Sequence, residues 1–200
     1  LSGSMPRTRT GQATSKVRYW DPEWRRVIYG SPNAYLDRII DAGFDGAYLD
    51  IIDAYEFFQG PEKTSAPRAS APKDMAAFVA AIAAYARASD PGFLIFPQNA
   101  PQLAGLVPEY LASVDGIGQE DIYFGYEADN EATAAGVTFE LERYLDVFKD
   151  AGKLVLTVDY ASKPENVDQA YSRALAKGYV PLATVRALDR LTLNAGHQPD

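Results

Sequence analysis

Acidic residues follow short apolar segments of this chain, and paired carboxyl groups at such positions could carry out acid–base chemistry. Asp50 and Asp53 follow the segment 47–49, and Glu120 follows the segment 116–119. In a parallel α/β fold these residues would lie at the carboxyl ends of strands, where such folds place their active sites. Two facing carboxyl groups, one protonated and one ionised, can protonate a leaving group and activate a nucleophile. Asp50 and Glu120 are therefore candidate catalytic residues.

Each of these carboxyl groups also has a purely structural interpretation. Asp50 could cap a helical turn over residues 51–58, with Asp53 at the spacing of a capping box. Glu120 could be a solvated loop residue beside Asp121. If both residues are catalytic, Glu120 is the expected acid, because apolar residues on either side of it would favour its uncharged form. Asp50 would then be the nucleophile or the base.

The composition excludes several classes of catalytic and metal site. The 200 residues include no cysteine and a single histidine, His197. Thiol chemistry, disulfides and metal centres built on cysteine are therefore excluded, and neither a Ser-His-Asp triad nor a His-rich metal site is expected. Proton transfer then falls to Asp, Glu, Tyr or Lys side chains. We predict no metal and no cofactor.

Charge and motif content argue against nucleic-acid and nucleotide partners. The chain has 27 acidic and 19 basic residues, and its formal net charge of −8 disfavours binding to nucleic acid. Neither Gly-x-Gly-x-x-Gly nor Gly-x-x-x-x-Gly-Lys-Ser/Thr occurs, so the usual signatures of dinucleotide and nucleotide sites are missing. No apolar segment approaches the roughly 20 residues that cross a bilayer, and we predict no membrane span.

Aromatic side chains make up 12% of the sequence, including 13 tyrosines. They could fill the core of a large sheet, or they could line a groove in which aromatic rings stack on sugars. The candidate stacking residues are Tyr19, Trp20, Tyr48 and Tyr123. For Tyr48 a place in the core is favoured, because it lies inside a predicted strand.

Polar residues at or near other strand ends complete the predicted substrate-binding set. Four of them are expected either to position the substrate or to support the residues that contact it: Asp53, Asn99, Asp159 and Tyr160. Arg186 could orient a nearby carboxylate through a bidentate ion pair, or it could simply end an exposed strand. A rim with several carboxylates would attract a cationic sugar polymer.

The elements that must place these residues alternate between strands and helices. Six short apolar segments are predicted as strands: residues 17–20, 46–50, 93–97, 116–120, 153–159 and 180–185. The clearest predicted helices between them are residues 32–42, 73–90, 138–151 and 164–177. Strands that alternate with helices indicate parallel βαβ units and an α/β fold.

Polar residues at the strand ends favour a TIM-type barrel over an open doubly wound sheet. Six strands are two βα units short of such a barrel. Residues 16–200 are predicted to form the barrel domain. Residues 1–15 are polar and contain Ser-Gly-Ser-Met, so they are predicted to be a disordered tail or a segment added during cloning, without a signal peptide.

Five motifs, in this order, resemble glycoside hydrolase family 114, the endo-α-1,4-polygalactosaminidase-like family of TIM barrels. They are Val17–Trp24, Leu36–Asp53, Ile95–Asn99, Gln119–Asp121 and Val158–Tyr160. Some members of this family were once confused with cysteinyl-tRNA synthetase-related proteins. The resemblance extends from about residue 16 to the end of the chain, and it implies that the first two strand–helix units of the barrel are lacking here.

The resemblance implies a glycosidase that cleaves α-1,4-linked, galactosamine-containing polysaccharide, with Asp50 and Glu120 as its carboxyl pair. An extracellular or cell-envelope location is expected for the parent protein. An incomplete barrel would leave two sheet edges open to self-association. The alternative is a barrel that binds carbohydrate, or has a structural role, without turnover. A relative of aminoacyl-tRNA synthetases is not favoured, because the chain lacks their His-rich signatures and a basic surface.

Overall fold

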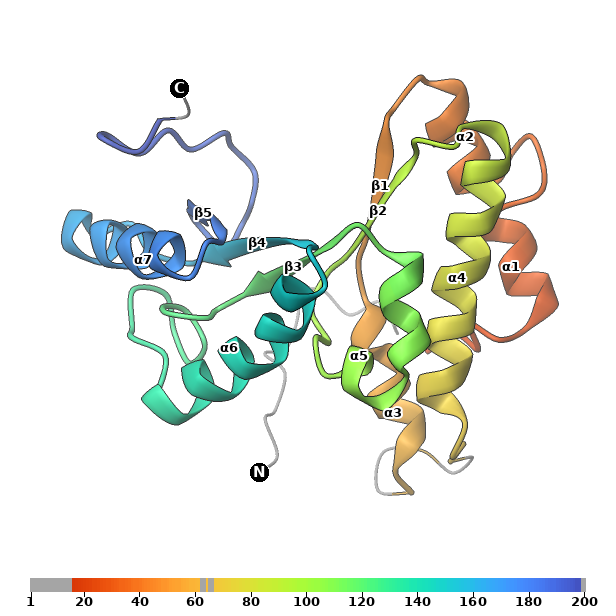
Figure 1. The fold of residues 1–200 in the computed structure, drawn as a ribbon, viewed down its shortest axis with the longest axis horizontal. Coiled ribbons are helices and arrows are strands. Elements are labelled where there is room, and N and C mark those ends of the chain that lie inside the picture. Colours follow the sequence, from red (N-terminus) through yellow and green to blue (C-terminus); the bar gives the residue numbers. More distant parts are fainter. Residues whose placement is uncertain (1–15, 62–63, 65–66, 199–200) are drawn as a thin grey trace.

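Parallel strands follow one another across the molecule in chain order, with helical segments between them (Figure 1). The computed structural model describes residues 16–61, 64 and 67–198. This part of the chain has five strands: β1 (Gly46–Leu49), β2 (Leu94–Pro97), β3 (Gly116–Glu120), β4 (Leu154–Asp159) and β5 (Val180–Ala183). β1 pairs with β2, and β3, β4 and β5 form a second parallel sheet. The predicted α/β fold with parallel strands is confirmed.

The two sheets meet between β2 and β3. A parallel bridge joins Gln98 to Gly118, and the Asn99 N–H donates to the Gly118 carbonyl oxygen at 2.7 Å. Near the other end of the strands, the Asp115 N–H donates to the Ile95 carbonyl oxygen at 3.0 Å. The strands therefore lie side by side in the order β1-β2-β3-β4-β5. This order is that of a TIM-type barrel, whereas the strand order of a doubly wound sheet reverses.

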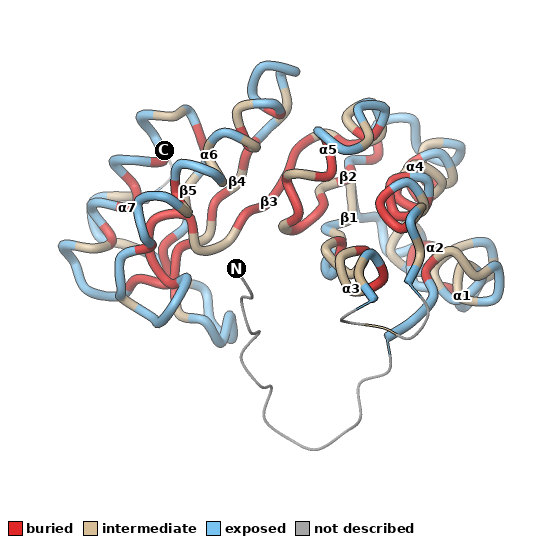
Figure 2. Tube along the Cα trace, turned by 90° about the horizontal axis from the view of Figure 1, so that it is seen from below, coloured by how far each residue is buried: buried red, intermediate tan, exposed pale blue. Residues whose placement is uncertain are grey.

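Most of the helices lie on the outer side of the arc that the strands form (Figure 2). The α-helices are α1 (Pro22–Ile28), α2 (Tyr35–Asp41), α3 (Tyr55–Gln59), α4 (Ala71–Ser89), α5 (Leu103–Leu106), α6 (Ala135–Asp150) and α7 (Pro164–Ala176). Two 3-10 helices among the described residues are η1 (Ile52–Ala54) and η2 (Pro108–Ser113). The helices predicted from the sequence correspond to α2, α4, α6 and α7, with only their ends shifted.

The strands have one face covered by helices and one open face. Ile95, Ile117 and Val155 are almost completely buried, whereas Leu154 and Val180 remain 52% and 51% exposed. Successive side chains of a strand point to opposite faces, and the register places the exposed residues together on the inner side of the arc. Exposed apolar patches of this kind mark surfaces that other protein segments cover.

The predicted strand at residues 17–20 is not observed, and the strands of the described residues do not close into a barrel. Residues 19 and 20 lie in a turn, and the Tyr19 hydroxyl donates to the Ala71 carbonyl oxygen at 2.8 Å. An apolar segment forms a strand only where a neighbouring strand satisfies its backbone groups. The described residues thus form five strands in two small sheets. The prediction for residues 1–15 lies outside the described residues.

Candidate active site

The inner side of the strand arc lines one cavity of about 500 Å³, which includes residues at the carboxyl ends of β1, β2 and β3. Asp50 follows β1 and Glu120 ends β3, and both line this cavity together with Tyr48 and Gln98. Leu188, from the segment after β5, lines it as well. The structure therefore brings the two predicted catalytic residues to the same space.

Glu120 is held by donors on both of its carboxylate oxygens. The Asn99 side-chain amide donates to Oε2 at 2.9 Å, and the Tyr160 hydroxyl donates to Oε1. Asn99 also accepts from the Glu120 N–H at 3.1 Å and from the Gln119 amide at 3.1 Å. Two donors on one carboxylate fix its orientation. The Glu120 side chain is therefore oriented by Asn99 and Tyr160.

Tyr48 lines the cavity together with the two candidate catalytic carboxylates. Its side chain is 49% exposed, so the interpretation that placed it in the core is wrong. Its hydroxyl donates to Gln98 Oε1, and a Cβ at Gly118 would come within 1.6 Å of the same hydroxyl oxygen. Glycine at position 118 therefore makes room for the ring. Burial, followed by the charges of Glu120 and Asp50, raises the pKa of Tyr48 to about 12, so the hydroxyl stays protonated.

Asp50 is exposed, and its side chain forms a bond only to the adjacent backbone among the described hydrogen bonds. Oδ1 accepts from the Ile51 N–H at 2.7 Å. No side chain caps η1, whose N-cap residue is Ile51, so the interpretation of Asp50 as a helix cap is wrong. Asp53 lies within electrostatic range of the pair. Burial and then the charge of Asp50 raise the pKa of Asp53, and Glu120 adds a smaller contribution.

Left-handed backbone conformations occur at the ends of three neighbouring strands. Ile51, Asn99 and Asp121 have φ angles of +61°, +61° and +60°. Such conformations are costly for residues other than glycine, and they persist where the surrounding structure holds them, often at functional sites. Here Ile51 and Asp121 directly follow the cavity residues Asp50 and Glu120, and Asn99 donates to Glu120.

Arg186 does not contact Glu120 directly. Its guanidinium carbon lies 4.0 Å from the centre of the Tyr160 ring. It also forms ion pairs with Asp129 and Asp121, at 2.7 Å and 3.5 Å. The expectation that Arg186 orients a carboxylate therefore applies to these two residues.

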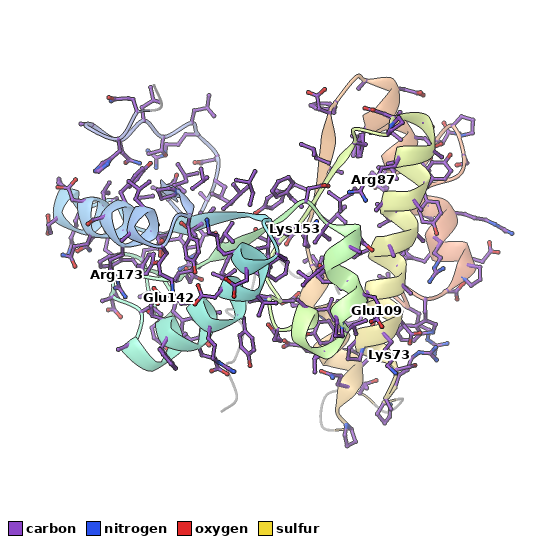
Figure 3. The ribbon with its side chains drawn as sticks, viewed as in Figure 1. Lys73, Arg87, Glu109, Glu142, Lys153 and Arg173 are labelled. Atoms are coloured by element: carbon purple, nitrogen blue, oxygen red, sulfur yellow. The ribbon has the colours of Figure 1, made fainter. Side chains whose placement is uncertain are left out.

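Three of the four candidate stacking residues lie away from the cavity. Tyr19 and Tyr123 are 2% and 0% exposed, so their rings cannot stack on a sugar, and their prediction as stacking surfaces is wrong. Trp20 packs edge-on against Phe58, and Arg68 lies over its ring at 4.6 Å. Figure 3 labels Arg173 of α7, whose guanidinium carbon lies 4.3 Å from the centre of the Tyr123 ring.

Asp159 is buried on the helix-covered side of β4. Its Oδ1 accepts from the Tyr123 and Phe124 N–H groups at 2.6 Å and 2.8 Å. Burial raises the pKa of Asp159 to about 6, although these two N–H groups lower it. With 1% of its surface exposed, Asp159 cannot contact a substrate, which leaves the supporting role of the two roles predicted for it. It instead fixes the backbone just after Glu120 and Asp121.

Sequence reasoning missed two contributors to this site. The Gln98 amide oxygen accepts a hydrogen bond from the Tyr48 hydroxyl. Gln98 directly precedes Asn99, so the same search for polar residues at strand ends could have found it. Leu188 carried no signal in the sequence, because its place at the cavity depends on how the segment after β5 folds back.

Among the described residues, no group of three or more His, Cys, Asp or Glu side chains is arranged to hold a metal ion. In the same part of the chain, every helix is too short or too polar to cross a membrane.

Sequence comparisons identify the family and several relatives. The sequence profile of glycoside-hydrolase family GH114 matches residues 12–198. An uncharacterized protein of Deinococcus radiodurans is 42% identical over 178 residues, which cover 89% of this chain and 53% of that protein. An uncharacterized protein of Thermotoga maritima is 34% identical over 193 residues, which cover 92% of this chain and 57% of that protein. The chain therefore spans about half the length of these relatives.

Solved structures share the fold. The glycoside hydrolase domain of PelA from Pseudomonas aeruginosa superposes with a TM-score of 0.64 at 22% sequence identity, covering 88% of this chain and 65% of that domain. A variant of the same domain in which one glutamate is replaced by alanine matches equally well, with a TM-score of 0.64. At this level of identity the likeness shows the fold alone.

Proposed function

The chain belongs to glycoside-hydrolase family GH114, and we propose that it carries the catalytic centre of a glycosidase that cleaves α-1,4-linked, galactosamine-containing polysaccharide. The observation that supports this most directly is that Asp50 and Glu120 line one cavity of about 500 Å³. Glycoside hydrolysis needs a carboxyl pair on either side of the scissile bond. Of the residues that line the cavity, these two are the acids.

The hydrogen bonds of the two carboxyl groups suit different roles. One oxygen of Asp50 accepts from the Ile51 N–H, and the residue is exposed. This arrangement suits a nucleophile or a base that activates water. Proton donation to the leaving oxygen then falls to Glu120, whose orientation Asn99 and Tyr160 set.

The charge around the cavity supports a cationic amino-sugar polymer as the substrate. Asp53 and Asp121 lie near the catalytic pair, since Glu120 raises the pKa of both, and the net charge of the chain is −8. A field of one sign focused in a cavity raises the local concentration of an oppositely charged substrate. Partly deacetylated polymer should therefore be cleaved faster than fully acetylated polymer at low salt, and the difference should shrink as salt is added.

Asp50→Asn and Glu120→Gln test the proposed chemistry. Each substitution keeps the size of the side chain, and we expect each to lower the release of reducing ends by at least about 100-fold while polymer binding persists. Asp150→Asn and Glu109→Gln are matched controls, because both residues are exposed on helical segments away from the cavity; Glu109 is labelled in Figure 3. Cleavage at the parent rate by both active-site variants would refute the assignment.

A carbohydrate-binding or structural barrel without turnover is the competing function. The exposed apolar residues on the inner side of the arc favour it, because a site left open to water does not shield a reaction centre. In that case the parent chain would bind the polymer and release no reducing ends, and the two active-site variants would bind it equally well.

We also propose that further strands cover the free edges of β1 and β5 in the whole protein. The chain spans about half the length of its relatives, and a barrel closes only when every strand edge is paired. The missing strands would come from the rest of a longer protein, or a second copy would cover the edges. A polymeric substrate would place that protein in an extracellular or cell-envelope location.

A further inference from the structure

The loop between β3 and α6, residues 121–134, packs against Tyr160, the residue that donates to Glu120. The Tyr160 N–H donates to the Phe124 carbonyl oxygen at 3.2 Å, and the Asn130 N–H donates to the Tyr160 carbonyl oxygen at 2.8 Å. A Cβ at Gly125 would lie 3.0 Å from the Tyr160 Cβ, and the φ angle of Gly125 is +115°. Glycine is therefore required where this loop meets the tyrosine.

Arg186 joins the same loop to the Tyr160 ring. Its Nε donates to Asp129 Oδ1 at 2.7 Å, and its Nη2 donates to the Gly125 carbonyl oxygen at 2.5 Å. The guanidinium carbon lies 4.0 Å from the centre of the Tyr160 ring. One guanidinium thus contacts the ring, the loop backbone and a loop carboxylate. A lysine cannot reproduce this set, because a single ammonium group lacks the planar arrangement of donors.

We propose that Arg186 is a positioning residue that, through the Tyr160 ring, keeps the Tyr160 hydroxyl on Glu120. The consequence for turnover rests on the proposed glycosidase function. Arg186 and Tyr160 are both absent from the residues that line the cavity, so substrate contacts remain when either is changed. Loss of Arg186 lets the whole Tyr160 side chain shift, and Glu120 then keeps only its side-chain bond from Asn99 among the donors described. Loss of the bond from Tyr160 to Glu120 should therefore lower kcat and leave KM nearly unchanged.

The test compares Arg186→Met, Arg186→Lys, Tyr160→Phe and the double variant Arg186→Met/Tyr160→Phe in the full 200-residue chain. We expect Tyr160→Phe and Arg186→Met each to lower kcat by about 10-fold with little change in KM. The double variant should be no slower than Tyr160→Phe, because residues that act through one another are not additive. Arg186→Lys should recover only part of the loss. Arg143→Met is the matched control, since Arg143 lies 4.7 Å from the ring of Tyr144 on α6.

A second measurement reports on Tyr160 without any substrate. In protein labelled with 13C at the tyrosine Cζ, the Tyr160 resonance is identified by its loss in Tyr160→Phe. We expect Arg186→Met to move this resonance, Arg186→Lys to move it less, and Arg143→Met to leave it in place. If Arg186→Met unfolds the chain, the smaller movement expected in Arg186→Lys carries the test, and an unmoved resonance in Arg186→Lys would then overturn the inference.

The outcomes separate this inference from the proposed function. An unchanged Tyr160 resonance in Arg186→Met would overturn the inference whether or not the chain is an enzyme. Additive losses of kcat in the double variant would also overturn it, because Arg186 would then act by another route. A parent chain that releases no reducing ends would refute the proposed function, while a moved resonance would still support the link between Arg186 and Tyr160.

Discussion

Ile51 adopts a left-handed backbone conformation directly after the Asp50 carboxylate, with a φ angle of +61°. For a β-branched residue this conformation costs about 1–2 kcal/mol. The side chain is 60% exposed, so little burial is lost when it is removed. We therefore expect Ile51→Gly to raise the free energy of unfolding by about 1 kcal/mol, measured by urea denaturation. Val147→Gly, in the helical conformation of α6, should lower it by a similar amount. A loss of stability in Ile51→Gly would show that the side chain contributes more than its conformation costs.

At the scale of elements, the register decides which strand-end residues reach the cavity. Glu120 pairs with Val158, so Glu120 and Val158 share the inner face of the sheet, and Asp159 points to the helices. The sequence places an acid after each of these apolar segments, but it does not reveal the register, and a shift of one residue changes the face. Asp50 and Glu120 could therefore be selected from the sequence, whereas the burial of Asp159 could not. The strand prediction for residues 17–20 was wrong for a related reason. Whether a segment forms a strand depends on a neighbouring strand, and the local sequence pattern does not show whether one is there.

The burial of Asp159 predicts how the stability of the chain changes with pH. Burial raises the pKa of Asp159 from 3.8 to about 6, so the folded chain favours the protonated form. The resulting stabilisation is fully present below about pH 3.8 and is lost as the pH rises through about 6. It amounts to at most about 3 kcal/mol, since each pKa unit corresponds to 1.36 kcal/mol. In Asp159→Asn, urea unfolding between pH 4 and pH 8 should depend less steeply on pH than in the parent. Asp150→Asn, on the exposed end of α6, should follow the parent, and an equally steep Asp159→Asn curve would contradict the prediction.

At the scale of the whole molecule, the open inner face of the arc should drive self-association of this chain. Leu154 and Val180 on this face are 52% and 51% exposed, and the edges of β1 and β5 are unpaired among the described residues. We expect the average mass measured by light scattering after size-exclusion chromatography to rise with protein concentration. Leu154→Lys and Val180→Lys should restore the monomer mass, because a charge on the inner face is costly to bury. Phe139→Lys is the control, since this residue is 70% exposed on α6. If the three lysine variants associate alike, contacts other than the inner face hold the copies together, and that face is free to receive the strands of a longer protein.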